Sequence, residues 1–151
     1  MQLGFVSAIF NDFSLEEVLS FAAAEDFDCV ELMCWPPGPR DRKYGGVTHI
    51  DCTDLSETRA TEIRAMCDEL GVEISGLGYY PNPLSPNAEE AEIAQAHLRR
   101  VIDGAVLIGR RQVNTFIGAD PAQSLEVNFS RFVETWPEIV RYAEERDVRI
   151  G

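Results

Sequence analysis

Residues 142–151 read YAEERDVRIG, and this stretch decides the fold class. It closes a helical segment, turns at Arg146 and Asp147, and continues into residues 148–150, which are typical of the start of an apolar strand. A strand at this point is the fifth in a chain that alternates strands and helices. The stretch therefore predicts a fold that needs a fifth strand, and we expect that fold to continue beyond Gly151.

Four strand-and-helix units precede this point. Apolar runs rich in β-branched and aromatic residues predict strands, and a segment with helical periodicity follows each of them. The predicted strands are residues 3–10, 29–34, 72–80 and 112–118.

Capping residues predict the limits of the helices between these strands. Ser14, with Glu17 three residues later, forms a capping box, and helix starts are also predicted at Ser56 and Asn87. The first helix stop is predicted at Gly71 and the next at Gly109. Pro137 lies inside the last helical segment, which we expect to be kinked or split there.

Strict alternation of strands and helices predicts an α/β fold with a parallel sheet and right-handed crossovers. A doubly wound domain would complete its fifth strand, and its nucleotide-binding forms have a glycine-rich turn after strand one. Here residues 10–14 read FNDFS, without glycine. The alternative is a partial (β/α)8 TIM barrel, with about four βα units plus the start of strand five. We expect one domain over residues 1–151 with helices only on the convex face. Its concave face is expected to carry four side chains or their neighbours along the strands: Phe5, Ile9, Met33 and Leu77.

Composition excludes several classes of function. The chain has 151 residues and a net charge of −13, which disfavours nucleic-acid binding. No apolar run approaches the ~18 residues that span a bilayer, so we expect no membrane association. The four cysteines match no Cys-x-x-Cys pattern, which is consistent with reduced thiols and a cytoplasmic location.

Five stretches, taken in order, resemble one known family. That family is the sugar phosphate isomerase/epimerase family, the xylose-isomerase-like TIM barrels, and the resemblance covers the whole chain in register. The stretches are GFVSAIFNDFSLEEVLSFAAAEDFDCVEL (4–32), GVTHIDC (46–52), LGVEISGLGYYPNPLSPN (70–87), RRVIDGAVLIGRRQVNTFIG (99–118) and WPEIVRYAEERDVRIG (136–151).

The resemblance implies an isomerase or epimerase that acts on a sugar or sugar phosphate. A divalent metal (Mn, Mg, Co or Zn) chelates a carbonyl and a neighbouring hydroxyl, and carboxylates move a proton through an enediolate. In this family two Glu, one Asp and one His hold the metal, and they come from strands five to eight. We therefore expect no catalytic residue and no metal ligand in this chain, which would supply the substrate-pocket half.

Candidate pocket residues follow from the strand ends, where barrels of this type place their active sites. Alternation along the second strand points Glu31 inward, where a carboxylate must pair with a polar group such as Asn114 or Ser7, or serve the site. Asn114, inward on the fourth strand, also needs a partner and is itself a candidate pocket residue. Aromatic and amide side chains at the loop mouths are expected to form a sugar-contact wall. They are Phe10, Trp35, Tyr79, Tyr80, Asn82 and Phe116, with core packing or a dimer contact as the alternative.

Two features of the loop after the second strand remain open. His49 either contacts substrate or is a solvated loop residue, and the basic cluster at residues 40–44 either binds a phosphate or carboxylate or is solvated. The other histidine, His97, is expected to have a packing or surface role on the third helix.

A second class of function competes with the enzyme. A non-catalytic half-barrel would dimerise or pair with another subunit, because the sheet edges at strands one and five are open. We therefore expect either a homo-oligomer or a missing C-terminal half. A third alternative is an apurinic-site endonuclease with the same barrel, a type of enzyme that is similar in fold but has a histidine-rich three-zinc site and basic DNA-binding loops. The two histidines and the net charge of −13 of this chain argue against it.

Overall fold

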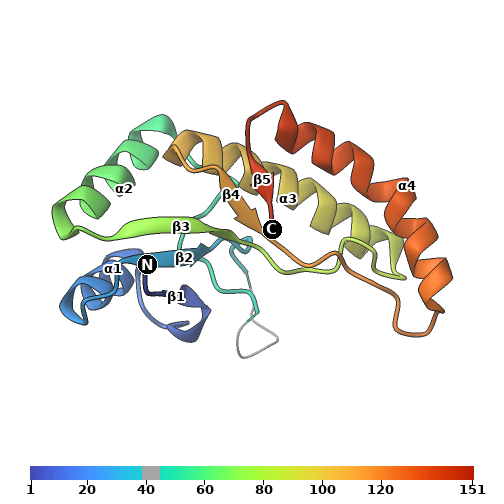
Figure 1. Cartoon of the computed structure of the whole chain (residues 1–151), viewed down its shortest axis with the longest axis horizontal. Helices are drawn as coiled ribbons and strands as arrows, with labels where there is room; N and C mark the ends of the chain where they lie inside the picture. Colours follow the sequence, from blue (N-terminus) through green and yellow to red (C-terminus); the bar gives the residue numbers. More distant parts are fainter. Residues whose placement is uncertain (39–44) are drawn as a thin grey trace.

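The computed structural model describes residues 1–38 and 45–151, in which strands and helices alternate (Figure 1). The basic cluster at residues 40–44 lies outside the described residues. The strands are β1 (Gly4–Val6), β2 (Cys29–Met33), β3 (Glu73–Gly78), β4 (Gln112–Asn114) and β5 (Arg149–Ile150). The helices are the 3-10 turn η1 (Ser7–Ile9), α1 (Leu15–Ala24), α2 (Glu57–Leu70), α3 (Ala88–Ile108) and α4 (Leu125–Glu144).

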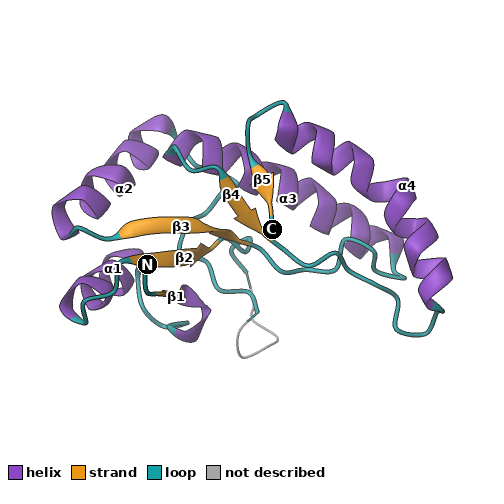
Figure 2. Cartoon of the chain, in the orientation of Figure 1, coloured by secondary structure: helices purple, strands orange, loops and turns teal. Residues whose placement is uncertain are grey.

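The sheet is parallel, with the strands in chain order, β1-β2-β3-β4-β5. Each α-helix packs beside the next one along the chain, and the helices lie along one side of the curved sheet (Figure 2). This arrangement confirms the predicted partial barrel and excludes the doubly wound alternative, in which strand order would reverse and helices would cover both faces. No helix in the described part of the chain combines the length and the apolar character needed to cross a membrane.

The predicted helix limits are confirmed by their capping bonds. Ser14 and Glu17 form the capping box, with the Glu17 N–H donating to Ser14 Oγ at 3.1 Å. Ser56 and Asn87 also accept backbone N–H bonds from the first turns that follow them. Gly71 and Gly109 end their helices in the left-handed conformation, where a Cβ atom would be strained.

The strands are shorter than their apolar runs predicted. The run over residues 3–10 forms a strand only to Val6, because Ser7 Oγ accepts the Met33 N–H at 3.0 Å and the chain then turns into η1. The other runs continue past their strands into loops at the same edge of the sheet. Of the two outcomes expected at Pro137, a kink or a split, the split does not occur: α4 is one helix through Pro137, with Trp136 and Ile139 buried on either side of it.

The two faces of the sheet differ in character. The helix-facing side is apolar and buried, and includes Val30, Leu32, Ile74, Leu77 and Val113. Phe5 and Leu77 pack on the helix side, so of the alternatives expected for the concave face at these two positions only their strand neighbours remain. Phe5 belongs to an aromatic cluster on that side with Phe10, Phe21 and Phe27.

Met33 and Ile9 lie apart from that core. Met33 is buried with Ala8 and Val47 in a small separate cluster that Trp35 and Tyr80 cover. Ile9 is exposed. The small cluster therefore supports the loops that leave the sheet at its carboxyl edge.

Candidate functional site

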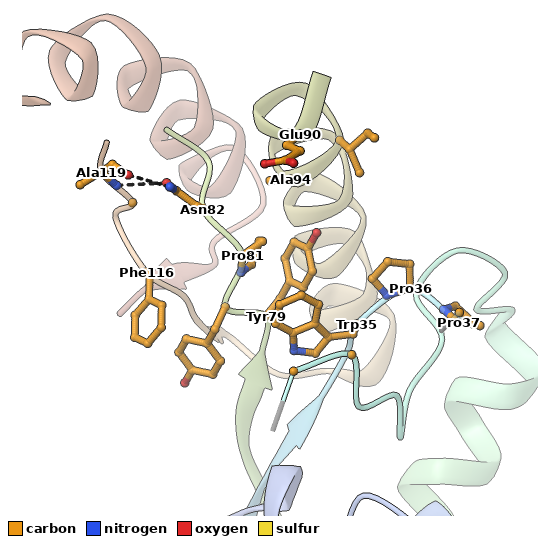
Figure 3. Close-up of a pocket in the computed structure, with 16 residues that line it drawn as sticks. Trp35, Pro36, Pro37, Tyr79, Pro81, Asn82, Glu90, Ala94, Phe116 and Ala119 are labelled. Atoms are coloured by element: carbon orange, nitrogen blue, oxygen red, sulfur yellow. Dashed lines mark hydrogen bonds between the residues drawn. The ribbon is translucent and has the colours of Figure 1, made fainter. Parts of the chain in front are cut away.

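A cavity of about 940 Å³ lies beyond the carboxyl ends of β2, β3 and β4 (Figure 3). The loops that follow these strands surround it, and the first turns of α3 close one side. Parallel sheets place ligand sites at this edge, because the loops that leave it converge there. The described lining residues are Trp35, Pro36, Pro37, Gly38, Gly45, Gly46, Tyr79, Tyr80, Pro81, Asn82, Glu90, Ile93, Ala94, Phe116, Gly118 and Ala119.

Trp35 and Tyr79 form the aromatic centre of the cavity, and in Figure 3 their rings lie beside each other. Their ring centroids are 5.2 Å apart in an edge-to-face arrangement. Tyr79 also contacts the ring of His97 on α3, at 4.5 Å between centroids. Burial raises the pKa of Tyr79 to about 12, so its hydroxyl stays protonated at neutral pH.

His97 of α3 packs against Tyr79 and so supports the aromatic centre of the cavity. It is buried, and its Nε2 donates to the carbonyl of Cys34 at 2.7 Å, which identifies Nε2 as the protonated nitrogen. Burial also lowers the pKa of His97 and favours the neutral ring. Of the packing and surface roles expected for His97, the structure shows packing.

Asn82 joins two of the loops. Its Nδ2 donates to the carbonyl of Ala119 at 2.7 Å, and its Oδ1 accepts the N–H groups of Ala119 and Leu84 (Figure 3). Gly118 has a φ of +83°, and a Cβ atom there would lie 2.3 Å from Asn82 Oδ1. Asn82 thus fixes the loop after β3 against the loop after β4, and Gly118 makes the close approach possible.

Glu31 lies on the concave face beneath the cavity and pairs with Asn114, one of the two partners considered from the sequence. Asn114 Nδ2 donates to Glu31 Oε2 at 2.5 Å, and the Tyr80 hydroxyl donates to Glu31 Oε1. Burial, followed by the bond to Glu31, raises the pKa of Tyr80. The Tyr80 ring packs on Phe116, at 4.9 Å between centroids, and both rings line the cavity.

The structure therefore brings most of the predicted pocket residues together. Trp35, Tyr79, Tyr80, Asn82 and Phe116 line the cavity, while Glu31 and Asn114 lie behind Tyr80. Their role in substrate binding stays a prediction.

Phe10 and His49 lie elsewhere. The Phe10 ring packs among Phe5, Phe13 and Phe21. His49 is buried rather than solvated: its Nδ1 pairs with Ser7 Oγ at 2.8 Å, and its Nε2 lies 3.2 Å from the carbonyl oxygen of Phe10. His49 therefore ties the loop after β2 to the turn after β1.

Several lining residues were missed in the sequence. Glu90, Ile93 and Ala94 come from α3, and the prolines and glycines offer no side-chain chemistry that marks a site. The Asn87 cap was a usable signal, since it starts α3 only a few residues after Asn82 and so places the first turns of the helix at the strand ends.

Within residues 1–38 and 45–151, no group of three or more His, Cys, Asp or Glu side chains is placed to hold a metal ion. The individual candidates are already engaged: Glu31 by Tyr80 and Asn114, and Asp120 by the Ala122 N–H. These residues do not fit the divalent metal implied by the resemblance, which needs several converging oxygen or nitrogen ligands.

Comparison with known proteins identifies the family. The model of the xylose isomerase-like TIM barrel family matches residues 19–151. The chain belongs to this family. No curated protein sequence matches it.

Solved structures agree with the family at the level of the fold. D-psicose 3-epimerase from Clostridium cellulolyticum H10, solved with D-tagatose, has a TM-score of 0.70 at 16% identity, over 99% of this chain and 51% of that one. A D-tagatose 3-epimerase-like protein has a TM-score of 0.68 at 23% identity, over 100% and 52%. The IolI protein with a bound zinc atom has a TM-score of 0.69 at 13% identity, over 100% and 50%.

The chain spans about half the length of each of these structures. Family membership therefore rests on the match over residues 19–151, and the likeness in structure shows the fold.

Proposed function

We propose that the cavity is the sugar-binding part of an isomerase or epimerase. The observation that supports this function is the position of an aromatic cavity of about 940 Å³ at the carboxyl ends of β2, β3 and β4. Sites of that size bind small molecules, and in (β/α)8 barrels this edge holds the active site. The family relationship favours a sugar as the ligand.

The chemistry of the lining suits a sugar. The rings of Trp35, Tyr79 and Phe116 offer flat apolar faces to the C–H groups of a sugar ring. Tyr79 keeps its proton at neutral pH, and Glu90 adds a carboxylate at the start of α3, so hydroxyl groups of a ligand would find both kinds of hydrogen-bonding partner.

The proposed reaction is a proton transfer next to the carbonyl of the sugar. A divalent metal, held by ligands outside the described residues, would polarise that carbonyl. The described residues bind and orient the sugar, and the metal ligands come from outside them. The chain by itself is therefore expected to bind sugar weakly and to catalyse no epimerisation.

The experiment is isothermal calorimetry of the chain with D-tagatose, D-fructose and Mn2+, together with a ketose epimerisation assay. Phe116→Ala is expected to weaken sugar binding at least about fivefold, since a ring contact of this kind contributes roughly 1 kcal/mol. The matched control is Phe129→Ala, because Phe129 on α4 is exposed to the same extent as Phe116 (62%) and does not line the cavity. Equal effects of the two substitutions, or no sugar binding by the wild type, would contradict the proposal.

A pairing role is the second candidate, and the outer side of α4 favours it. Phe129, Val133 and Val140 are exposed on this helix, and β5, the strand that follows it, is at the end of the sheet. Exposed apolar side chains on a helix at the end of a sheet are typical of an interface. Light scattering at micromolar concentration tests this role: Val133→Asp would convert a dimer to a monomer, whereas a monodisperse wild-type monomer would refute it.

A further inference from the structure

Three side chains from separate segments meet on the concave face below the cavity. Glu31 comes from β2, Asn114 from β4, and Tyr80 from the loop that follows β3. The two oxygens of Glu31 accept one bond each, from Tyr80 and from Asn114. Asn114 Oδ1 in turn accepts from Gln112 Nε2 at 2.7 Å, which fixes the orientation of the Asn114 amide.

This bridge crosses a strand. β2 and β4 are not neighbours, because β3 lies between them, and strands lie about 4.8 Å apart, so the bridge spans roughly 10 Å. Gly78 of β3 pairs with Met33 on one side and Asn114 on the other. A Cβ atom at Gly78 would lie 2.5 Å from Glu31 Oε1. The Glu31 carboxylate can therefore cross β3 only because residue 78 is a glycine.

The donors on Glu31 suggest what its carboxylate does. Each oxygen accepts one bond from the protein, and Glu31 is not among the residues that line the cavity, so its contact with the cavity runs through a neighbour that lines it. Tyr80 is that neighbour: its hydroxyl is fixed by Glu31, and its ring packs on Phe116 in the cavity wall.

We infer that Glu31 is a positioning residue of the pocket, which, together with Asn114, holds the Tyr80 phenol and so fixes the Tyr80–Phe116 wall against which a ligand binds. The statement about the ligand rests on the proposed function. The statement about the wall does not, and it can be tested without any sugar.

The wall is tested by fluorine NMR of the chain labelled with 3-fluorotyrosine, whose phenol ionises at lower pH than that of tyrosine. Tyr80→Phe assigns the Tyr80 signal. In Glu31→Gln this signal is expected to change position and to titrate at lower pH than in the wild type, because the neutral amide no longer opposes the tyrosinate charge. The control is Glu73→Gln, a strand glutamate whose hydrogen bond to Gln2 is exposed.

An unchanged Tyr80 signal and titration in Glu31→Gln would overturn the inference. If Glu31→Gln fails to fold by circular dichroism, Asn114→Ser takes its place, since it removes the other contact of the same carboxylate. Because Glu31 keeps its charge in this variant, the Tyr80 signal is expected to change position without a fall in its titration pH, and an unchanged signal would again overturn the inference.

The ligand statement is tested with D-tagatose by calorimetry on a double-mutant cycle. Glu31→Gln and Tyr80→Phe are each expected to weaken binding about fivefold or more, and the double variant to be no weaker than Tyr80→Phe alone, because both changes release the same ring. Additive losses would overturn the positioning role. If the wild type binds no sugar, the proposed function fails, and the NMR result still decides whether Glu31 holds Tyr80.

Discussion

The two faces of the sheet are built from the same strands by different means. On the helix side, Val30, Leu32 and Leu77 are fully buried, and the face is specified by filling volume. On the concave side, Glu31 and Asn114 pair across Gly78, and that face is specified by hydrogen bonds and by the absence of a side chain. Alternating residues of the same strands therefore build an apolar core on one face and a polar layer on the other. The core should be sensitive to the loss of side-chain volume, and the polar layer to the loss of a hydrogen bond or the addition of a side chain.

The largest expected effect is on the helix side. Leu77→Ala removes a fully buried side chain from the core and is expected to lower the free energy of unfolding by about 2–5 kcal/mol. Urea unfolding followed by circular dichroism measures this change. Leu125→Ala is the control, since Leu125 is 80% exposed on α4 and should change stability little. Similar losses for both variants would show that the helix-facing core is not the main source of stability.

The next effect tests the concave side. Gly78→Ala places a methyl group against Glu31 and Met33 and is expected to cost about 1–3 kcal/mol of folding free energy, because the bridge must shift. Gly38→Ala is the matched control, since no atom lies within 4 Å of a Cβ built at that glycine. Urea midpoints compare the two. A Gly78→Ala variant as stable as Gly38→Ala would mean that the concave side tolerates a side chain at this point.

The order of elements was predictable from the sequence, for a physical reason. Helical periodicity and caps are local signals, so Ser14, Gly71 and Gly109 gave correct helix limits. The ends of the strands were not predictable in this way. They depend on where partner strands stop, and Ser7 ends β1 by bonding to Met33, a residue distant in sequence.

The candidate site was predictable in part. Strand ends placed Trp35, Tyr79, Tyr80, Asn82 and Phe116 near one another, because parallel strands end at a common edge. The orientation of Phe10 and the burial of His49 were not predictable. Each depends on the path of a loop and on a partner far along the chain, such as Ser7 for His49.

A smaller effect concerns His97, which lies behind the cavity. Because burial lowers its pKa in the folded state from the ordinary value of 6.5, the unfolded chain takes up the proton first as pH falls. Stability is therefore expected to decline as pH falls below about 6.5, and to decline less in His97→Gln, which can still donate an N–H to Cys34. Urea midpoints at about pH 8 and pH 5 measure this; His49 is present in both chains, so their difference isolates His97. An equal decline in both would contradict the assignment.

The smallest expected effect lies outside both faces, on the helix surface. Arg59 of α2 pairs with Glu16 of α1 at 2.9 Å, and this bond lowers the pKa of Glu16 below its ordinary value of 4.5. Both side chains are largely exposed, so Glu16→Gln is expected to cost about 0.5 kcal/mol or less at neutral pH.

The sign of that effect can be checked with acid and salt. A carboxyl group with a lowered pKa stabilises the fold above 4.5 and loses that contribution as pH falls, so wild type and Glu16→Gln should converge in acid. They should also converge at about 1 M salt, where the screening length is only ~3 Å. Glu138→Gln is the control, because its pair with Arg99 is longer, at 3.9 Å. A loss in Glu16→Gln as large as that in Gly78→Ala would show that surface charge, rather than the contrast between the two faces, dominates stability.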